Sequence, residues 1–281
     1  MTTSTTSNPR DKALLLHSLH TPGRPLALAN GWDVASARII EEAGAAAVAT
    51  TSCGVAWSLG YADGDRLPRE LALALIGRIA SAVGVPVSAD IESGFGEGAA
   101  GVADTVRGVL AAGAVGINIE DSLVDRPAQL RDLAEQAERI AAARRVADEA
   151  DVPLFVNART DVYLRGIGEP EERLGAALER AAAFIEAGAS GIFVPGVTDL
   201  AVVAQLAKNI SVPLNILTGP GGPSVAELAA AGVARVSIGG RMAEAAYGVV
   251  RQEVREFLTD GTCTPAVDGL GYGDLQALFT S

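Results

Sequence analysis

Apolar and polar positions along this chain follow a repeating order that two sequence cues mark. The first cue is a helical stretch that ends in Ala-Gly and runs into a short apolar segment; its glycines suit the left-handed position that closes a helix. These glycines are Gly44, Gly113, Gly188 and Gly232. The second cue is a proline directly before an apolar segment, where a strand needs no hydrogen-bond donor. These prolines are Pro25, Pro86, Pro153 and Pro213.

Interleaved, the two cues predict eight strands, each followed by a helix. Segments 68–84 and 170–188 illustrate the helices, because Leu, Ile and Ala fall on one face, charged residues fall on the other, and a proline stands near each start. Eight such units in 281 residues predict an α/β fold, a (βα)8 TIM barrel in a single domain. The alternative is an open doubly wound sheet, which the regular eightfold count disfavours.

The repeat also suggests how the chain is organised. We expect residues 1–23 to form an N-terminal arm with a short helix and residues 24–258 to form the barrel. The segment TDGTCTPAVDGLGYGDLQALFTS does not continue the repeat. Residues 259–281 are therefore interpreted as a C-terminal extension that packs on the barrel or on a partner subunit.

A pair of acidic residues stands where one apolar strand ends, in the segment VPVSADIESGFG. Because strand residues alternate between faces, Asp90 and Glu92 are expected to point the same way, together with Ser88. Two carboxylates on one face just before Gly94 and Gly96 are costly unless something positive lies between them. A divalent metal ion is the usual solution, so the motif predicts a metal site.

Polar residues also stand at the ends of other predicted strands, and in such a barrel the carboxyl ends of the strands carry the chemistry. These residues are Asn30, Thr51, Ser52, Cys53, Asn118, Glu120, Asn157, Arg159, Asn215 and Ser237. We interpret the whole as a polar chamber with three carboxylates and one guanidinium. The alternative is an internal ion pair between Arg159 and a carboxylate, but one arginine cannot neutralise three acids.

The chemistry of the chamber follows from its donor atoms. Histidine and thiolate clusters are missing from it, so carboxylates and water favour a hard ion, Mg²⁺ or alternatively Mn²⁺. Arg159 would then be free to hold a substrate carboxylate or a developing oxyanion. A metal and one arginine facing a 2-oxo acid would stabilise an enolate, the shared intermediate of many C–C cleavages.

Composition narrows the classes of function. The formal net charge of −12 argues against nucleic-acid and anionic-membrane surfaces, but it leaves an anionic small molecule open as a ligand. Cys53 and Cys263 are too few for a disulfide framework or a zinc cluster. Both histidines, His17 and His20, lie near the N-terminus. The polar start of the chain and the lack of an apolar run of membrane-spanning length predict a cytoplasmic protein.

Five segments together resemble the isocitrate lyase and phosphoenolpyruvate mutase superfamily, in its 2-methylisocitrate lyase-like and phosphonomutase-like branch, over nearly the whole chain. They are NGWDVASAR, TSCGVAWSLGYADGD, SADIESGFG, GINIED and NARTDVYLRG. The resemblance implies a (βα)8 barrel that exchanges its last helix with a neighbouring subunit. It also implies a homotetramer built from two such dimers, acting on a small 2-oxo or 2-hydroxy acid.

The resemblance assigns roles to individual residues. The metal motif of the superfamily, Asp-x-Asp-Thr-Gly, corresponds to Asp90-Ile91-Glu92-Ser93-Gly94, which implies that Glu92 binds the metal directly. The implied metal residues are Glu92, and, through water, Asp90, Asp63 and Glu120. The implied substrate-binding residues are Thr51, Ser52 and Cys53, through backbone N–H groups, with Asp90, Arg159 and Asn215. The implied catalytic residues are Arg159, Glu120 and Tyr61.

One departure from the superfamily bears on the reaction. Isocitrate and methylisocitrate lyases carry a Lys-Lys/Arg-Cys-Gly-His loop after the strand-end glutamate, whereas Glu120 is followed here by DSLVDRP. Without that Cys, Lys and His, those two activities are disfavoured. The Lys and Asn of the mutase in the same loop are also missing, which disfavours its route. We therefore expect a Mg²⁺-dependent lyase that cleaves or decarboxylates a small 2-oxo or 2-hydroxy acid through a metal-stabilised enolate. Water, Tyr61 or Ser122 would supply the proton.

Other interpretations stay open. The protein could act on the P–C bond of a phosphonopyruvate-type substrate as a mutase or hydrolase, or bind a 2-oxo acid without turnover. The loops LTGPGGPS and SIGGRM could bind phosphate, but three facing carboxylates would repel it. Cys53 is interpreted as a small, partly buried thiol rather than a nucleophile, because no histidine follows it. Asp33 is interpreted as a helix cap.

Overall fold

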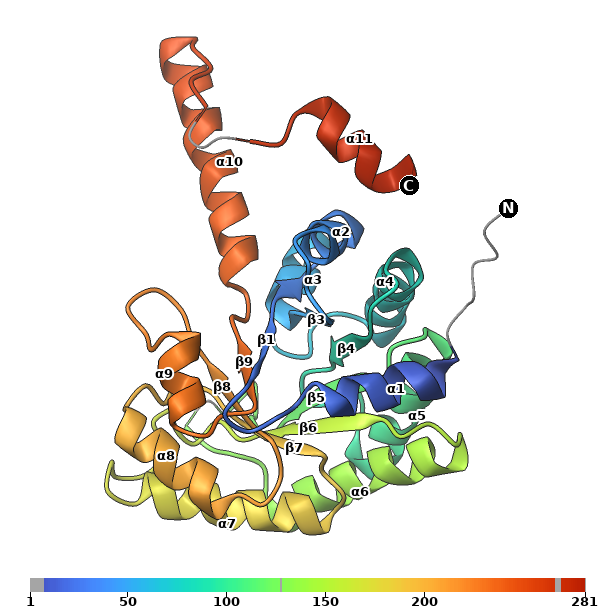
Figure 1. The fold of residues 1–281 in the computed structure, drawn as a ribbon, viewed down its shortest axis with the longest axis vertical. Coiled ribbons are helices and arrows are strands. Elements are labelled where there is room, and N and C mark those ends of the chain that lie inside the picture. The colour runs from blue at the N-terminus through green and yellow to red at the C-terminus, as the bar shows by residue number, and fades with distance from the viewer. Residues whose placement is uncertain (1–7, 127, 266–268, 281) are drawn as a thin grey trace.

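Short parallel strands form a ring at the centre of the molecule (Figure 1). The computed structural model describes residues 8–126, 128–265 and 269–280, and nine strands lie within these ranges. They are β1 (Leu26–Leu28), β2 (Asn30–Gly31), β3 (Val48–Thr50), β4 (Val87–Asp90), β5 (Gly116–Glu120), β6 (Phe155–Arg159), β7 (Gly191–Val194), β8 (Leu214–Leu217) and β9 (Arg235–Ser237). The ring closes at Ala29, because β1 pairs with β9 whereas β2 pairs with β3. The predicted (βα)8 barrel is therefore confirmed, with its first strand in two halves.

The helices lie mainly around the outside of this ring. They are α1 (Pro9–Ser18), α2 (Val34–Glu42), α3 (Ser52–Ser58), α4 (Arg69–Ala82), α5 (Gly98–Ala111), α6 (Leu133–Glu149), α7 (Arg173–Glu186), α8 (Leu200–Asn209), α9 (Val225–Ala230), α10 (Arg241–Asp260) and α11 (Tyr272–Thr280). The two helices predicted over 68–84 and 170–188 are α4 and α7. Asp33 caps α2 through the N–H of Ser36, as expected from the sequence.

The main hydrophobic core lies between the ring and the helices. On β5, Ile117 and Ile119 face outward into this core and are fully buried. Asn118 and Glu120 alternate with them and therefore face the inside of the barrel. The alternation separates an apolar shell from a polar interior. The sequence analysis predicted the polar chamber in this interior.

Helix α1 closes the amino-terminal end of the barrel. Its residues Ala13 and Leu16 are fully buried in a cluster that includes Phe155 at the start of β6. The ring of His20 stacks on Phe155 with centroids 3.9 Å apart, and His17 lies 4.9 Å from the same ring. Both histidines are therefore part of the packing at the end opposite the predicted site.

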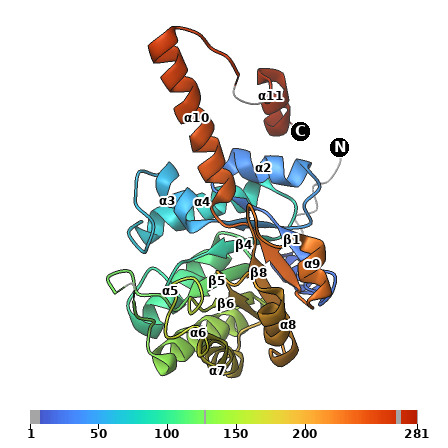
Figure 2. The ribbon, with the colours of Figure 1, turned by 90° about the vertical axis from the view of Figure 1, so that its left-hand side faces the viewer.

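Helix α10 projects away from the barrel, and the chain then turns back so that α11 lies near α2 (Figure 1, Figure 2). Ala243, close to its start, is the buried residue of α10. The helix continues to Asp260, past the boundary predicted at residue 258. Within the described ranges, no helix is long and apolar enough to span a membrane.

Candidate active site

A belt of hydrogen-bonded polar side chains crosses the inside of the barrel. Asn118 Nδ2 donates to Asp90 Oδ1 (3.2 Å), and Asn157 Nδ2 donates to Asn118 Oδ1 (3.1 Å). Asn157 Nδ2 also lies 3.1 Å from Asn215 Oδ1, and Asn215 Nδ2 donates to Ser237 Oγ (3.1 Å). The register of the sheet produces the first two links, because Asp90 pairs with Asn118 and Asn118 pairs with Asn157. Most polar groups of the belt thus bond to one another, although Asn157 Oδ1 has no hydrogen-bond partner among the described residues.

A cavity of about 160 Å³ opens at the carboxyl ends of the strands. Six of the ten predicted site residues line it: Thr51, Ser52, Cys53, Asp63, Asp90 and Arg159. The other four, all within the described ranges, do not line it: Tyr61, Glu92, Glu120 and Asn215. Six of the predicted site residues thus lie together at the carboxyl ends of the strands.

Asp90 is held in one orientation by hydrogen bonds with four neighbours, one of which is the N–H of Glu92, 3.3 Å from Asp90 Oδ1. Its backbone N–H donates to Thr50 Oγ1 (2.8 Å), and its Oδ2 accepts from the N–H of Ser52 (3.1 Å). Its Oδ1 accepts from Asn118, as part of the belt. The N–H of Ser52, which the resemblance assigned to a substrate carboxylate, is therefore already engaged by Asp90.

Glu92 reaches the site through a turn, and not along the strand as predicted from the alternation of faces. Strand β4 ends at Asp90, and Glu92 has a left-handed backbone with φ of +52°. Its Oε2 accepts a hydrogen bond from the N–H of Asp65, while its buried Oε1 has no hydrogen-bond partner among the described residues. Arg139 stabilises the turn, because its Nη2 donates to Ser93 O and to Gly96 O.

Arg159 is not free, and this corrects the expectation from the sequence. Its Nη1 lies 2.6 Å from Glu120 Oε2, which is the ion pair that the sequence analysis disfavoured. Its Nε and Nη2 lie 2.6 Å and 2.9 Å from the two oxygens of Asp161. Sequence reasoning missed Asp161, although its place two residues after Arg159 was a signal. One guanidinium is thus shared by two carboxylates.

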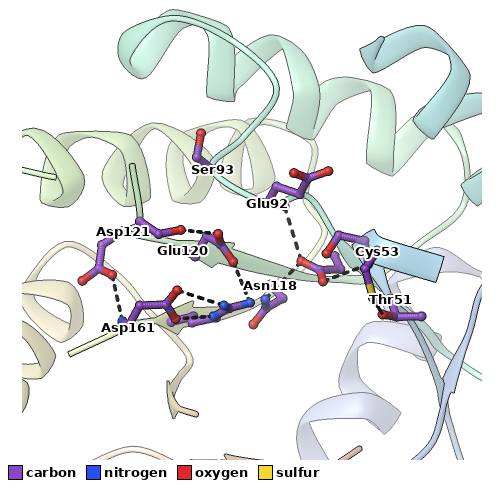
Figure 3. A network of polar contacts seen from close by, with 12 residues as sticks. Thr51, Cys53, Glu92, Ser93, Asn118, Glu120, Asp121 and Asp161 are labelled. Carbon is purple, nitrogen blue, oxygen red and sulfur yellow. Dashed lines mark hydrogen bonds and ion pairs between the residues drawn. The ribbon is translucent and has the colours of Figure 1, made fainter. Parts of the chain in front are cut away.

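A second layer of buried charge lies behind Arg159. Asp121 Oδ1 accepts from the N–H of Asp161 (2.9 Å), and Asp121 Oδ2 lies 2.6 Å from Arg180 Nε. Both aspartates are fully buried. Figure 3 shows Asp121 and Asp161 on one side of the network and Thr51 and Cys53 on the other, with Asn118 between them. This layer was also missed, because Arg180 lies on α7, far from Asp121 in the sequence.

Burial raises the pKa of several acids in this region. The pKa of Glu92 is raised to about 8, mainly by burial and further by the charges of Asp65, Asp90 and Asp63. The pKa of Asp63 is raised by burial and then by Asp90. Burial also raises the pKa of Glu120, against the opposing charge of Arg159, and Ser122 Oγ donates to Glu120. These acids therefore hold their protons more tightly than free carboxyl groups do, and a cation placed beside them would favour their charged forms.

These acids form a loose group rather than a closed coordination sphere. Within the described ranges, no set of three or more His, Cys, Asp or Glu side chains is close enough to hold a metal ion directly. One direct carboxylate with water-mediated partners is compatible with this spacing, because Mg²⁺ retains several waters in proteins. The unpartnered Oε1 of Glu92 is the atom that such an ion would satisfy.

Two of the predicted site residues, Tyr61 and Asn215, lie outside the cavity lining. Tyr61 is 37% exposed and lies outside the cavity lining, which separates it from the assigned catalytic role. Asn215 belongs to the polar belt and bonds Asn157 and Ser237, so its amide is engaged by the barrel itself.

Cys53 is a neutral thiol in the cavity wall. Burial raises its pKa, and its Sγ lies 3.3 Å from Thr51 Oγ1. This agrees with the interpretation of Cys53 as a partly buried thiol rather than a nucleophile.

Comparison with known proteins identifies relatives of this chain. Residues 16–258 match the phosphoenolpyruvate phosphomutase family. An uncharacterised protein of Mycobacterium tuberculosis is 37% identical, over 93% of this chain and 94% of its own. The 2-methylisocitrate lyase of Escherichia coli is 33% identical over 84% and 86% of the two chains, and the oxaloacetate decarboxylase of Pseudomonas fluorescens is 32% identical over 73% and 68%. A structure of phosphonopyruvate hydrolase with oxalate and Mg²⁺ superposes with a TM-score of 0.81, at 27% identity over 95% and 94% of the chains.

Proposed function

Since this chain belongs to the phosphoenolpyruvate phosphomutase family, within the isocitrate lyase/phosphoenolpyruvate mutase superfamily, we propose that it is a Mg²⁺-dependent lyase acting on a small 2-oxo or 2-hydroxy carboxylic acid. The reaction is cleavage of a C–C bond, decarboxylation included, with an enolate as the first product. The observation that carries the proposal is that one cavity wall brings the carboxyl groups of Asp63 and Asp90 together with the guanidinium of Arg159, which contacts the buried Glu120.

The proposed metal residues are Glu92 directly and Asp90, Asp63 and Glu120 through water. The raised pKa values of Glu92 and Asp63 support this, because a cation beside them would offset the cost of burying their charge. When bound, Mg²⁺ would stabilise the negative charge that develops on the 2-oxo oxygen of the substrate. Mn²⁺ would suit the same oxygen donors.

Arg159 is proposed to bind the substrate with the hydrogens that its ion pairs leave unused. A guanidinium has five N–H groups, and the contacts with Glu120 and Asp161 take three of them. One hydrogen on each of Nη1 and Nη2 remains, and Arg159 lines the cavity. These two donors suit a carboxylate or a developing oxyanion.

Ser122 is proposed as the proton donor on the loop that replaces the Cys-containing loop of the lyases. Its hydroxyl donates to Glu120, which in turn contacts Arg159. The burial that raises the pKa of Glu120 favours retention of a proton on this pair. Neither Ser122 nor Tyr61, the other side chain considered, lines the cavity, but Ser122 is buried beside Glu120 whereas Tyr61 is exposed.

Turnover of a substrate panel, followed by NMR, tests the proposal. The panel contains oxaloacetate, methylisocitrate, isocitrate, dimethylmalate and phosphonopyruvate, each with Mg²⁺ and with excess chelator. Because Mg²⁺ itself promotes decarboxylation of oxaloacetate, the matched control is the Glu92→Ala variant at the same metal concentration. Chelator-sensitive release of pyruvate or another 2-oxo acid, absent from the control, is the expected result.

Two other outcomes would replace the proposal. Phosphate or phosphoenolpyruvate formed from phosphonopyruvate would assign the protein to P–C bond chemistry, which the likeness to phosphonopyruvate hydrolase keeps in view. Binding of 2-oxo acids with no turnover of any member of the panel would identify a binding protein.

We also propose that the protein is a homo-oligomer in which α10 is exchanged between subunits. The helix carries exposed apolar side chains that no part of the described chain covers, among them Val250, Val254 and Phe257. At the base of α10, an apolar groove of about 580 Å³ lies beside Ile39 and Ile40 of α2. A helix from a partner subunit would fill this groove and cover its own apolar face. A monomer in analytical ultracentrifugation would refute this arrangement.

A further inference from the structure

Arg235 is a buried guanidinium for which the structure provides no anion. It lies on β9, where the adjacent Val236 faces the outer core, so Arg235 faces the inside of the barrel. Arg235 is only 3% exposed, and its Nε and Nη1 have no hydrogen-bond partner among the described residues. Within the same ranges, the ion pairs of the barrel interior involve Arg159 and Arg180 but not Arg235.

The charge on Arg235 persists at neutral pH. Burial lowers the pKa of Arg235 to about 10, and the negative charge of Asp90 opposes that shift. A guanidinium with a pKa near 10 remains protonated in the cell, so the barrel holds a permanent buried cation. An unpaired buried charge is costly, and proteins keep one mainly where a ligand completes it.

Arg235 lines the same cavity as Asp90 and Arg159. Ser88 and Ser237 are among the hydroxyl-bearing residues that line this cavity, and the buried Ser88 Oγ has no hydrogen-bond partner among the described residues. The guanidinium of Arg235 and the hydroxyl of Ser88 both face this cavity, and both offer hydrogen-bond donors that no described residue accepts. Asp90 does not fill this role, because among the described residues no hydrogen bond joins it to Nε or Nη1 of Arg235.

The two arginines of the cavity therefore differ in their charge balance. Arg159 is neutralised by Glu120 and Asp161, whereas Arg235 has no carboxylate in contact among the described residues. Resting on the proposed function, we propose that Arg235 binds a second carboxylate of the substrate, the one remote from the 2-oxo group, and so selects dicarboxylic over monocarboxylic 2-oxo acids. Ser88 is the second donor to this carboxylate.

Two matched probes test the assignment without turnover. The first is 3,3-difluorooxaloacetate, known as an inhibitor of oxaloacetate acetylhydrolase, which has both carboxylates. The second is 3,3-difluoro-2-oxobutanoate, in which a methyl group replaces the remote carboxylate. Their affinities are measured by titration calorimetry with Mg²⁺ for the wild type, Arg235→Gln and Arg235→Lys. Arg144→Gln is the control, because Arg144 is also largely buried but bonds Gly188 O and Leu154 O away from the cavity.

The expected result is a preference of the wild type for the dicarboxylate of about tenfold or more, as for a charge-assisted contact. Arg235→Gln should remove that preference by weakening the dicarboxylate alone, and Arg235→Lys should keep part of it. Arg144→Gln should keep all of it.

Two results would overturn the assignment. One is that the wild type binds both probes with equal affinity. This result is obtained from the wild type alone, so it does not depend on whether a variant folds. The other is an Arg235→Gln protein in which both affinities fall equally, which would make Arg235 a structural counter-charge to Asp90. Failure of the proposed function is distinct: the panel of substrates would then give no turnover, whatever the ratio between the probes.

Discussion

Asp161 holds the guanidinium of Arg159 by a two-point ion pair, with Nε 2.6 Å from Oδ1 and Nη2 2.9 Å from Oδ2. Glu120 contacts the third nitrogen of the same group. Asp161 is fully buried, and its own N–H donates to Asp121. The direction in which Arg159 faces the cavity is therefore set by a carboxylate that does not itself line the cavity.

We expect Asp161→Asn to impair substrate binding while leaving the barrel folded. The amide keeps the size of the side chain but loses its charge, so one of the two strong contacts with Arg159 is lost. The KM for the substrate should rise about tenfold, with a smaller effect on kcat. Steady-state kinetics on the active substrate of the panel measure both.

Asp125→Asn is the control for this variant. Asp125 is exposed, and its oxygen lies 3.9 Å from Arg66, so its loss should change neither constant. An unchanged KM in Asp161→Asn would show that Glu120 alone suffices to position Arg159.

Glu92→Ala and Arg159→Ala are each expected to abolish activity without unfolding the barrel. The first removes the carboxylate proposed to bind Mg²⁺, and the second removes the proposed substrate-binding cation, whose loss would cost at least a hundredfold in kcat/KM. Glu97→Ala is the matched control for Glu92, because Glu97 is an exposed residue of the following loop. Retained activity in either folded variant, with circular dichroism like that of the wild type, would remove its residue from the site.

The fold could be predicted from the sequence because local residue patterns mark the starts of strands and the ends of helices in the barrel. Prolines such as Pro86 stand just before strands, and glycines such as Gly113 end helices with positive φ. Each signal acts over a few residues, and eight repetitions left little choice of architecture. Six of the predicted site residues lie together in one cavity, because the carboxyl ends of parallel strands meet at one end of a barrel.

The rest of the site depends on contacts that no local pattern encodes. Strand alternation predicted the direction of Glu92, but the strand ends at Asp90 and a left-handed turn redirects the chain. The partners of Arg159 could not be chosen by counting charges, because Asp161 was not counted among the acids. Arg235 escaped notice because it lies before the end of its strand, where an apolar residue is the rule.

Arg139 supports the turn that carries Glu92, and its removal should destabilise the protein. The side chain is almost completely buried on α6, and its Nη2 donates to the carbonyl oxygens of Ser93 and Gly96. Arg139→Met keeps the bulk but leaves two carbonyl oxygens without these donors, which should lower the free energy of unfolding by about 3 kcal/mol. Urea unfolding measures this loss.

Arg107→Met provides the comparison for Arg139. Arg107 is half-exposed on α5 and pairs with Asp104 at 2.7 Å, so its substitution should cost less than about 0.5 kcal/mol. Equal stabilities of the two variants would mean that the turn holds its shape without Arg139. A further consequence is measurable in calorimetry, where Mg²⁺ should bind Arg139→Met more weakly than Arg107→Met.

His20 makes the stability of the barrel depend on pH. Its ring is buried against Phe155, its Nδ1 lies 2.7 Å from Leu16 O, and Nε2 has no hydrogen-bond partner among the described residues. Burial and the nearby charge of Arg235 lower the pKa of His20 to about 3. Between this value and the usual pKa of 6.5, the unfolded chain binds a proton that the native protein does not bind. The native state therefore loses stability as the pH falls below 6.5.

We expect His20→Phe to remove this loss, because phenylalanine keeps the ring stack on Phe155 but cannot be protonated. From about pH 7.5 to about pH 5.5, one such histidine should cost the wild type about 1.4 kcal/mol relative to the variant. The raised pKa of Glu92 acts in the opposite direction, since the native protein then binds the extra proton, but it is common to both proteins and cancels in the difference. Urea unfolding of the two proteins at both pH values gives that difference. A variant that loses as much stability as the wild type would mean that α1 opens and admits the proton without cost to the barrel.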